Sequence, residues 1–233
     1  MRALSSPDFL DLWERGCNLH PVDQGLLALR AALPKASQDS LADWPLGRRN
    51  RALVALRCSC FGPSLKAWTS CHRCGEKLEF ELDGEAWGAS SDQVEPIVVE
   101  GRSFRSPTSR DLARAAGEAD LGLAIRRLVG GCLMGSTDSL EELSEEDLNE
   151  IGERMAAADP LAETRLTLHC PECGEEWEES FDIVRFFWAE IEARAKRALF
   201  EVHTLASAYG WSEREVLSLS ESRRAVYLER ILA

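Results

Sequence analysis

The stretch TSCHRCGEKLEFELDG, residues 69–84, is followed far downstream by LHCPECGEEWEESFDI, residues 168–183. Each stretch holds two cysteines separated by two residues, then a glycine, and then residues that alternate along the chain. Such a C-x-x-C-G pattern is typical of a knuckle that turns both sulfurs to the same side. The glycine permits the positive φ that the turn often needs. Two such knuckles that face each other complete a four-sulfur metal site.

Four thiolates satisfy the tetrahedral coordination of zinc, with Zn–S distances of about 2.3 Å. Because a shell of four thiolates leaves no position for water, the sequence predicts a structural Zn²⁺ site and no catalytic metal. Metal binding would clamp the two ends of the intervening segment together and supply folding free energy. The predicted ligands are Cys71, Cys74, Cys170 and Cys173.

Two other interpretations of the cysteine pairs are redox dithiols and simply buried thiols. A redox C-x-x-C motif normally opens a helix after a strand, whereas strand-like residues follow both pairs here. The remaining cysteines, in apolar or glycine-rich segments, are predicted to be buried free thiols. Whether some neighbouring side chains join the metal site stays open. These are Cys58, Cys60, His72 and His169, and the other two free thiols are Cys17 and Cys132.

The residues that follow the first knuckle predict a half-exposed strand. In EKLEFELD, residues 76–83, three apolar side chains (Leu78, Phe80 and Leu82) share one face. The segment AWTS before the knuckle is the expected partner strand. TRLTLH and EEWEESFDI repeat this layout around the second knuckle. The sequence therefore predicts a split zinc-ribbon module made of two distant hairpins, residues 64–83 and 164–182.

Helical patterns fill the rest of the chain. Residues 1–63 predict three helices, with a loop at PKASQDSLADWPLG, residues 34–47. Residues 84–163 predict a mostly helical insertion with a short hairpin that turns at Glu100-Gly101. A helix is expected to begin at Thr108, with Asp111 as its capping-box partner, and an acidic helix is expected within residues 143–160. The fold class is α+β, mainly helical, with helices flanking the zinc ribbon and inserted into it.

The C-terminal region, residues 183–233, contains the longest predicted helix. Its apolar stripe begins after Asp182 and continues to about Tyr209, where Gly210 ends it. Ser212 with Glu215, and then Ser218 with Glu221, predict caps for two short helices. The early turns of the long helix add Ile183 and Phe186 beyond the stripe. Trp211 is either a packing plug or an exposed anchor, and Phe186 and Trp211 are the candidate partner-binding residues.

Composition bounds the functions that the chain can have. It has 233 residues, 45% of them hydrophobic, and a net charge of -13. An acidic surface repels phosphate backbones and anionic membranes, so we expect no nucleic-acid partner and no membrane partner. The sequence has no secretory signal and no apolar run long enough to cross a bilayer. These features predict a cytoplasmic protein whose eight cysteines are reduced.

The sequence offers little support for catalysis. It contains no P-loop, GxGxxG, nucleophile elbow or HExxH pattern. His20 and His203 have no acid or nucleophile placed beside them by the sequence, so we expect no enzyme. An alternative function is that of a nucleic-acid-binding or transcription-associated zinc ribbon, which needs a basic face. The strands after both knuckles are instead rich in glutamate.

A family resemblance lies in FFWAEIEARAKRALFEVHTLASAYGWSEREVLSLSESRRAVYLERI, residues 186–231. This segment resembles the baseplate hub assembly chaperones and baseplate proteins of bacteriophage T4 type, which have relatives in gene clusters for phage tail-like contractile injection systems. The residues that carry the resemblance are Glu201, Val202, His203, Tyr209, Gly210, Trp211, Ser212, Arg223, Arg224 and Tyr227.

The knuckles, and the segment LHPVDQ that contains His20, fit the injection-system relatives too. The resemblance implies a non-enzymatic accessory protein that helps to assemble a baseplate or hub, or is incorporated in the tail-like particle. Its implied partners are baseplate or hub proteins.

Overall fold

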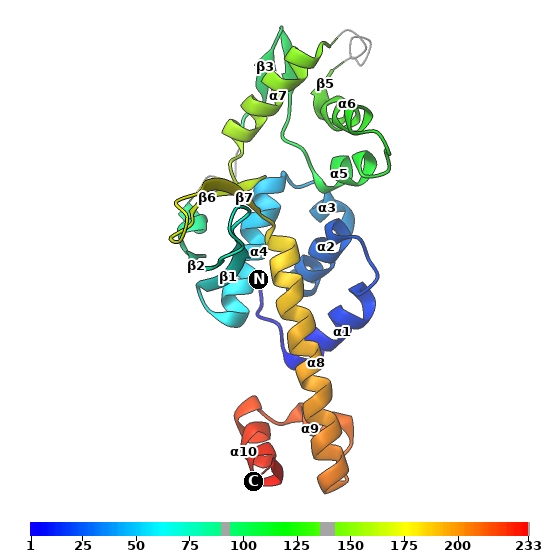
Figure 1. The fold of residues 1–233 in the computed structure, drawn as a ribbon. Helices are drawn as coiled ribbons and strands as arrows, with labels where there is room; N and C mark the ends of the chain where they lie inside the picture. The colour runs from blue at the N-terminus through cyan, green and yellow to red at the C-terminus, as the bar shows by residue number, and fades with distance from the viewer. Residues whose placement is uncertain (90–93, 136–142, 233) are drawn as a thin grey trace.

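The computed structural model describes residues 1–89, 94–135 and 143–232 (Figure 1). It confirms the predicted class, a mainly helical α+β protein with small antiparallel sheets. The helices are α1 (Ser6–Gly16), α2 (Pro21–Ala32), α3 (Gln38–Ala42), α4 (Leu46–Phe61), α5 (Ser109–Ala115), α6 (Leu121–Cys132), α7 (Glu145–Ala158), α8 (Ile183–Tyr209), α9 (Glu213–Ser218) and α10 (Glu221–Leu232), with a 3₁₀ turn η1 (Ala86–Ala89). The strands are β1 (Ser64–Ser70), β2 (Lys77–Asp83), β3 (Ile97–Val99), β4 (Arg102–Phe104), β5 (Leu133–Met134), β6 (Thr164–His169) and β7 (Glu176–Phe181).

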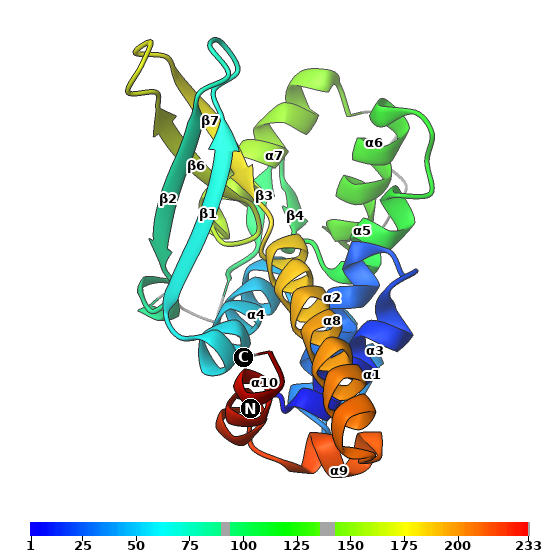
Figure 2. The same cartoon turned by 60° about the horizontal axis from the view of Figure 1, so that its bottom comes forward.

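The main core lies where α1, α2 and α4 pack against the first half of α8. Helix α8 runs through the molecule as its spine, and its second half carries α9 and α10 (Figures 1 and 2). Asp182 caps it by accepting a hydrogen bond from the Val184 N–H at 2.8 Å, and Gly210 ends it with a φ of +70°. Core side chains that are fully buried include Leu12, Leu29, Leu53, Leu56, Phe187 and Ile191.

The segment predicted as a loop, residues 34–47, contains the short helix α3. Ser37 Oγ accepts a hydrogen bond from the Ser40 N–H at 3.1 Å, which begins the helix, and Leu41 is completely buried. Five helical residues are too few for an apolar repeat to be recognised in the sequence, so the prediction of a plain loop was wrong.

The insertion forms a lobe of its own around a second core (Figure 1). The predicted hairpin is present as β3 and β4, with positive φ at Glu100 and Gly101, and β5 adds a third strand that was not predicted. The single helix expected from Thr108 is two helices, α5 and α6. The break falls after Ala115, and Asp120 starts α6 by accepting a hydrogen bond from the Leu123 N–H at 2.8 Å.

Buried polar contacts attach this lobe to the main body. The backbone N–H of Gly47 donates to Asp159 Oδ2 at 3.0 Å, and Asn50 Nδ2 donates to the carbonyl oxygen of Leu161 at 2.7 Å. Arg49 reaches Ser109 Oγ at 3.2 Å. These contacts fix both chain connections of the lobe to the start of α4.

The C-terminal helices fold back onto α8 and α1. The Arg224 side chain, which is 3% exposed, donates to Glu201 Oε2 at 2.7 Å and to Ser6 Oγ at 3.2 Å. Helix α9 has the predicted capping box of Ser212 and Glu215. The predicted cap of α10 was wrong, because that helix begins after Ser220 and the Ser218 hydroxyl instead donates to a carbonyl within α9.

Candidate metal centre

The two hairpins bring the knuckles to the same end of the module. Strand β1 pairs antiparallel with β2, and β6 with β7, over their full lengths. Figure 2 shows the two hairpins extending together from the helical body, with both turns at the tip. The inward-facing side chains are those predicted from the alternation, among them Leu78, Phe80, Leu82, Trp177 and Phe181.

Both knuckles have the same backbone geometry. In the first, the Cys71 N–H donates to the Glu76 carbonyl at 2.8 Å and the Gly75 N–H to the Cys71 carbonyl at 2.9 Å. In the second, the corresponding bonds of Cys170 and Gly174 measure 2.8 and 3.0 Å. The two glycines have φ values of +77° and +72°, the left-handed region that favours glycine. This requirement explains why a glycine follows each cysteine pair.

The four sulfurs converge across the hairpin boundary. Cys71 Sγ lies 3.6 Å from Cys173 Sγ, Cys74 Sγ lies 3.5 Å from Cys170 Sγ, and all four atoms are within 4.8 Å of one another. A tetrahedron with metal–sulfur bonds of about 2.3 Å places its sulfurs about 3.8 Å apart. A disulfide would need about 2.05 Å. The cluster therefore has the size of a metal-binding tetrathiolate and not that of a disulfide pair.

The electrostatics of the cluster favour a bound cation. The backbone N–H of Cys74, helped by that of Arg73, lowers the pKa of the Cys71 thiol to about 6. The Glu76 N–H lowers the pKa of Cys74, but burial and the three neighbouring sulfurs outweigh it and raise that pKa to about 12. One thiolate thus opposes ionisation of the next, and a divalent cation at the centre would remove this repulsion.

The neighbouring histidines lie outside the four-sulfur group. His72 is exposed, its Nε2 atom is 3.9 Å from Glu179 Oε2, and its ring centroid is 5.4 Å from that of Trp177. His169 is exposed as well. Within the described residues, the group that could hold a metal consists of the four cysteines alone.

The other cysteines also lie elsewhere. Cys60 Sγ accepts a hydrogen bond from the Leu4 N–H at 3.4 Å, and Cys58 packs against the main core, where burial raises its pKa. Cys132 is fully buried, as expected. Cys17 is exposed, so the prediction of a buried thiol was wrong there, because the residue follows the last turn of α1 on its solvent side.

Glu179 is a site residue that sequence reasoning missed. Its Oε2 atom accepts hydrogen bonds from Trp177 Nε1 at 3.1 Å and from Thr69 Oγ1 at 3.4 Å, so it joins the two hairpins. The glutamate run suggested a solvated face. However, Glu179 has the same parity as Trp177 and Phe181, and this alternation could have placed it on the inner face.

The apolar surface predicted at the start of α8 is covered within the chain. Ile183 is 2% exposed, which corrects the expectation that it is surplus. Phe186 is half-buried, with its ring 5.3 Å from Phe181 and 5.6 Å from the guanidinium of Arg57. The exposed large apolar side chains of α8 lie in its second half, at Leu199, Phe200 and Tyr209.

Trp211 lies far from Phe186 along the spine helix, in an aromatic cluster. Its ring stacks on Tyr209 at 4.8 Å and meets the Tyr227 ring edge-on at 5.0 Å. Of the two roles left open by the sequence, the structure shows the packing contact. The two candidate partner-binding residues are therefore not brought together.

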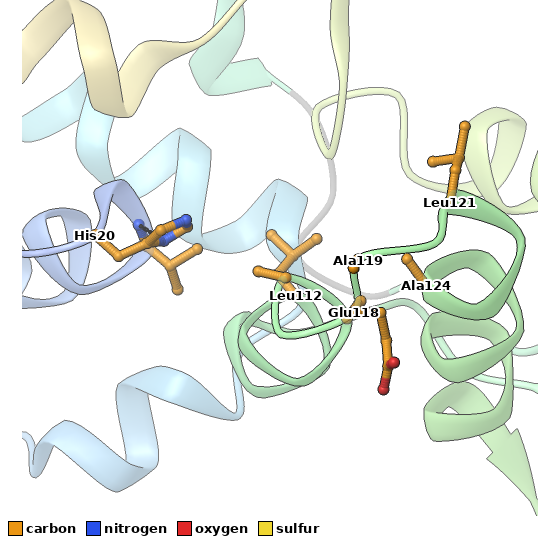
Figure 3. A pocket seen from close by; sticks show the side chains of 9 residues that line it. His20, Leu112, Glu118, Ala119, Leu121 and Ala124 are labelled. Atoms are coloured by element: carbon orange, nitrogen blue, oxygen red, sulfur yellow. Dashed lines mark hydrogen bonds between the residues drawn. The ribbon is translucent and has the colours of Figure 1, made fainter.

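An apolar pocket of about 440 Å³ lies between the start of α2, α5 and α6 (Figure 3). Its titratable lining residues are His20 and Glu118, and the other lining side chains are aliphatic. Figure 3 shows the Glu118 carboxylate pointing away from His20. His20 Nδ1 accepts a hydrogen bond from the Val22 N–H at 3.3 Å, so this histidine serves as the N-cap of α2. Enzyme pockets usually combine an apolar lining with several converging polar groups. This lining instead has only two titratable side chains among aliphatic ones.

No family model, curated protein or solved structure matches the chain. In the described part of the chain, none of the helices is long and apolar enough to span a bilayer.

Proposed function

We propose that the four cysteines bind one structural Zn²⁺ ion. The observation that carries this proposal is the closed set of four sulfurs, all within 4.8 Å, contributed in pairs by two knuckles of identical geometry. Zinc suits a tetrahedral tetrathiolate, and such a shell leaves no position for a reactive water. The ion would clamp the two hairpins and so close the loop that contains the insertion.

The wider role proposed is that of a non-enzymatic accessory protein of a contractile phage tail or tail-like injection system, acting in baseplate or hub assembly or as a baseplate component. The resemblance of the C-terminal region supports it. The residues that carry the resemblance make mutual contacts: Glu201 pairs with Arg224, and the rings of Tyr209, Trp211 and Tyr227 pack together. A chain related to that family would keep these residues because they hold α9 and α10 on α8.

Co-purification tests the wider role. An affinity-tagged chain is expressed in its native host, tail-like particles and assembly intermediates are isolated, and proteins that accompany the tag are identified by mass spectrometry. We expect baseplate or hub proteins in the tagged fraction. Trp211→Ala should reduce their recovery, because it loosens the C-terminal helices. Recovery of transcription proteins instead would favour the nucleic-acid-associated alternative, and absence of baseplate and hub proteins contradicts the proposal.

A further inference from the structure

A groove opens between the two hairpins and the start of α8. It has a volume of about 270 Å³, and its apolar walls include Phe80, Leu166 and Phe181 from the hairpins and Phe186 from α8. Two charged residues at the start of α8, Asp182 and Arg185, line its end. Three consecutive residues of β1, 67–69, and three consecutive residues of β7, 179–181, also line it. Because successive side chains of a strand point to opposite faces, a groove that meets consecutive residues reaches one edge of each strand as well as the inner faces.

Both of these edges lack a strand partner on the groove side. In the described residues, β1 is paired with β2 and β7 with β6, each in a two-stranded sheet. Across the groove, the Thr69 side chain of β1 donates a hydrogen bond to Glu179 of β7. Unpaired edges present rows of N–H and C=O groups that can accept an added strand. The geometry therefore suits an extended segment better than a helix.

Trp68 stands at the rim of this groove and is 69% exposed. On its own strand pair it faces Glu79, and the ammonium of Lys77 lies 5.8 Å from its ring centroid. A second hollow of about 460 Å³ adjoins the groove and is bordered by two carboxylates, Glu79 and Glu81, and by one lysine, Lys66. An exposed indole flanked by carboxylates is a favourable position for a cation. The ammonium of Lys77 already makes a cation–π contact of this kind with Trp68.

The charge of the two hairpins specifies the partner further. Residues 64–83 and 164–182 hold four lysines and arginines against ten aspartates and glutamates, a net charge of −6. Four thiolates with one divalent cation would add two further negative charges. An acidic surface of this kind attracts basic segments and repels acidic ones.

We propose that the groove between β1 and β7 binds an extended segment of a partner protein in which apolar side chains alternate with lysine or arginine. The apolar side chains would enter the groove, the backbone would pair with a free strand edge, and a basic side chain would lie on Trp68. This inference deepens the proposed assembly role and rests on it, since it names the surface and the chemistry of the partner.

Purified zinc-loaded protein is titrated into a fluorescently labelled peptide that alternates lysine and valine over about six to eight residues, the usual length of a strand. Fluorescence anisotropy reports binding. We expect saturable binding that weakens with added salt. Two control peptides should not bind. One has glutamate in place of each lysine, and the other keeps the lysine–valine composition but places its valines at helical spacing. Amide exchange should slow in residues 67–69 or 179–181 when the first peptide binds.

Trp68→Ala should weaken binding about thirtyfold, the effect expected for an anchoring tryptophan. Because Trp68 is largely exposed, this variant should keep the melting temperature and metal content of the parent. Phe200→Ala is the matched control, as it removes another exposed aromatic on the far half of α8 and should leave binding unchanged.

Three outcomes overturn the inference: no binding of the lysine–valine peptide at about 1 mM, equal binding of the glutamate peptide, or binding that is unaffected by Trp68→Ala. Self-association of the chain that Trp68→Ala abolishes, without peptide binding, would assign the groove to a second copy instead. The peptide assay uses the isolated protein, so its failure leaves the co-purification result as a separate test of the assembly role.

Discussion

Arg57 joins α4 and the start of β1, which are neighbours in the sequence, to the distant helix α8. Its side chain is 5% exposed and makes two hydrogen bonds to the carboxylate of Glu190, at 2.9 and 2.6 Å. Its Nη1 atom donates to the carbonyl oxygens of Gly62 and Ser64, at 2.7 Å each. One guanidinium thus ties the end of α4 and the start of β1 to the spine helix α8.

Replacing Arg57 by Ala should lower the free energy of unfolding by about 3–5 kcal/mol, because it leaves two carbonyls and a partly buried carboxylate without their donor. Urea unfolding followed by circular dichroism measures the change. Glu190→Gln is the matched control and should cost less, since the amide oxygen still accepts from Arg57. Equal losses for both variants would show that the carbonyl contacts contribute little.

The second prediction at this scale concerns the metal ligands. Cys71→Ser removes a buried ligand, so the purified variant should lose most of its zinc and melt at a lower temperature. Cys17→Ser changes an exposed thiol away from the cluster and should retain both. Metal content by mass spectrometry and thermal unfolding provide the measurements. A Cys71→Ser protein with one equivalent of zinc and an unchanged melting temperature would contradict the assignment of this ligand.

At the scale of the elements, two glycines allow the effect of backbone conformation on stability to be tested without a change in side-chain packing. Gly210 ends α8 with a φ of +70°, whereas Gly152 lies within the exposed face of α7, and an added Cβ would meet no atom within 4 Å at either position. Gly210→Ala should destabilise by about 1 kcal/mol through backbone strain, and Gly152→Ala should stabilise by about 0.5–1 kcal/mol through helix propensity. Changes of the same sign in chemical denaturation would refute this account.

The capping box of α5 has a pH dependence. Burial raises the pKa of Asp111, but hydrogen bonds from Arg105 and Thr108 outweigh it and hold the pKa below its usual range. A lowered folded-state pKa stabilises the protein above the unfolded-state value of about 3.9, and this stability is lost as the pH falls through the folded value.

Asp111→Asn should therefore reduce stability at pH 7 by about 2 kcal/mol and make the acid limb of the stability curve shallower. Urea unfolding at a series of pH values tests both effects. The corresponding change in the exposed box of α7, Asp147→Asn, should cost less. An acid limb as steep as that of the parent would show that other carboxylates dominate it.

Elements with strong local signals were predictable, and those that depend on tertiary contacts were not. The alternating residues around each knuckle predicted both hairpins, and the apolar stripe with Gly210 predicted α8. Helix α3 and strand β5 were missed because five and two residues carry no readable period. The repeated C-x-x-C-G pattern predicted the four-sulfur cluster. The alternation in β7 could have placed Glu179 on the inner face, but its bond to Thr69 of the other hairpin depends on tertiary packing. The burial of Ile183 depends in the same way on which neighbours pack there.

At the scale of the whole molecule, the hairpin module and the helical core have different sources of stability. The core of α1, α2, α4 and α8 buries a continuous set of leucines and aromatic side chains. The hairpins are two-stranded, and most of their inward side chains stay half-exposed. Two-stranded hairpins are marginal by themselves in water, so the module should depend on its metal far more than the core does.

Removing the metal should accordingly unfold the module and leave the core intact. We expect that a chelator with a mild reductant will speed amide exchange in β1, β2, β6 and β7, while α2, α4 and the first half of α8 stay protected. The far-UV helical signal should change little, because the strands hold few of the ordered residues.

Returning one equivalent of zinc should restore protection in all four strands together, since one ion joins both hairpins. Loss of protection in α4 and α8 at the same rate as in the strands would mean that the metal stabilises the entire fold. Unchanged exchange in the strands after complete metal removal would mean that the inter-hairpin contacts, such as Thr69 with Glu179, suffice to hold the module without it.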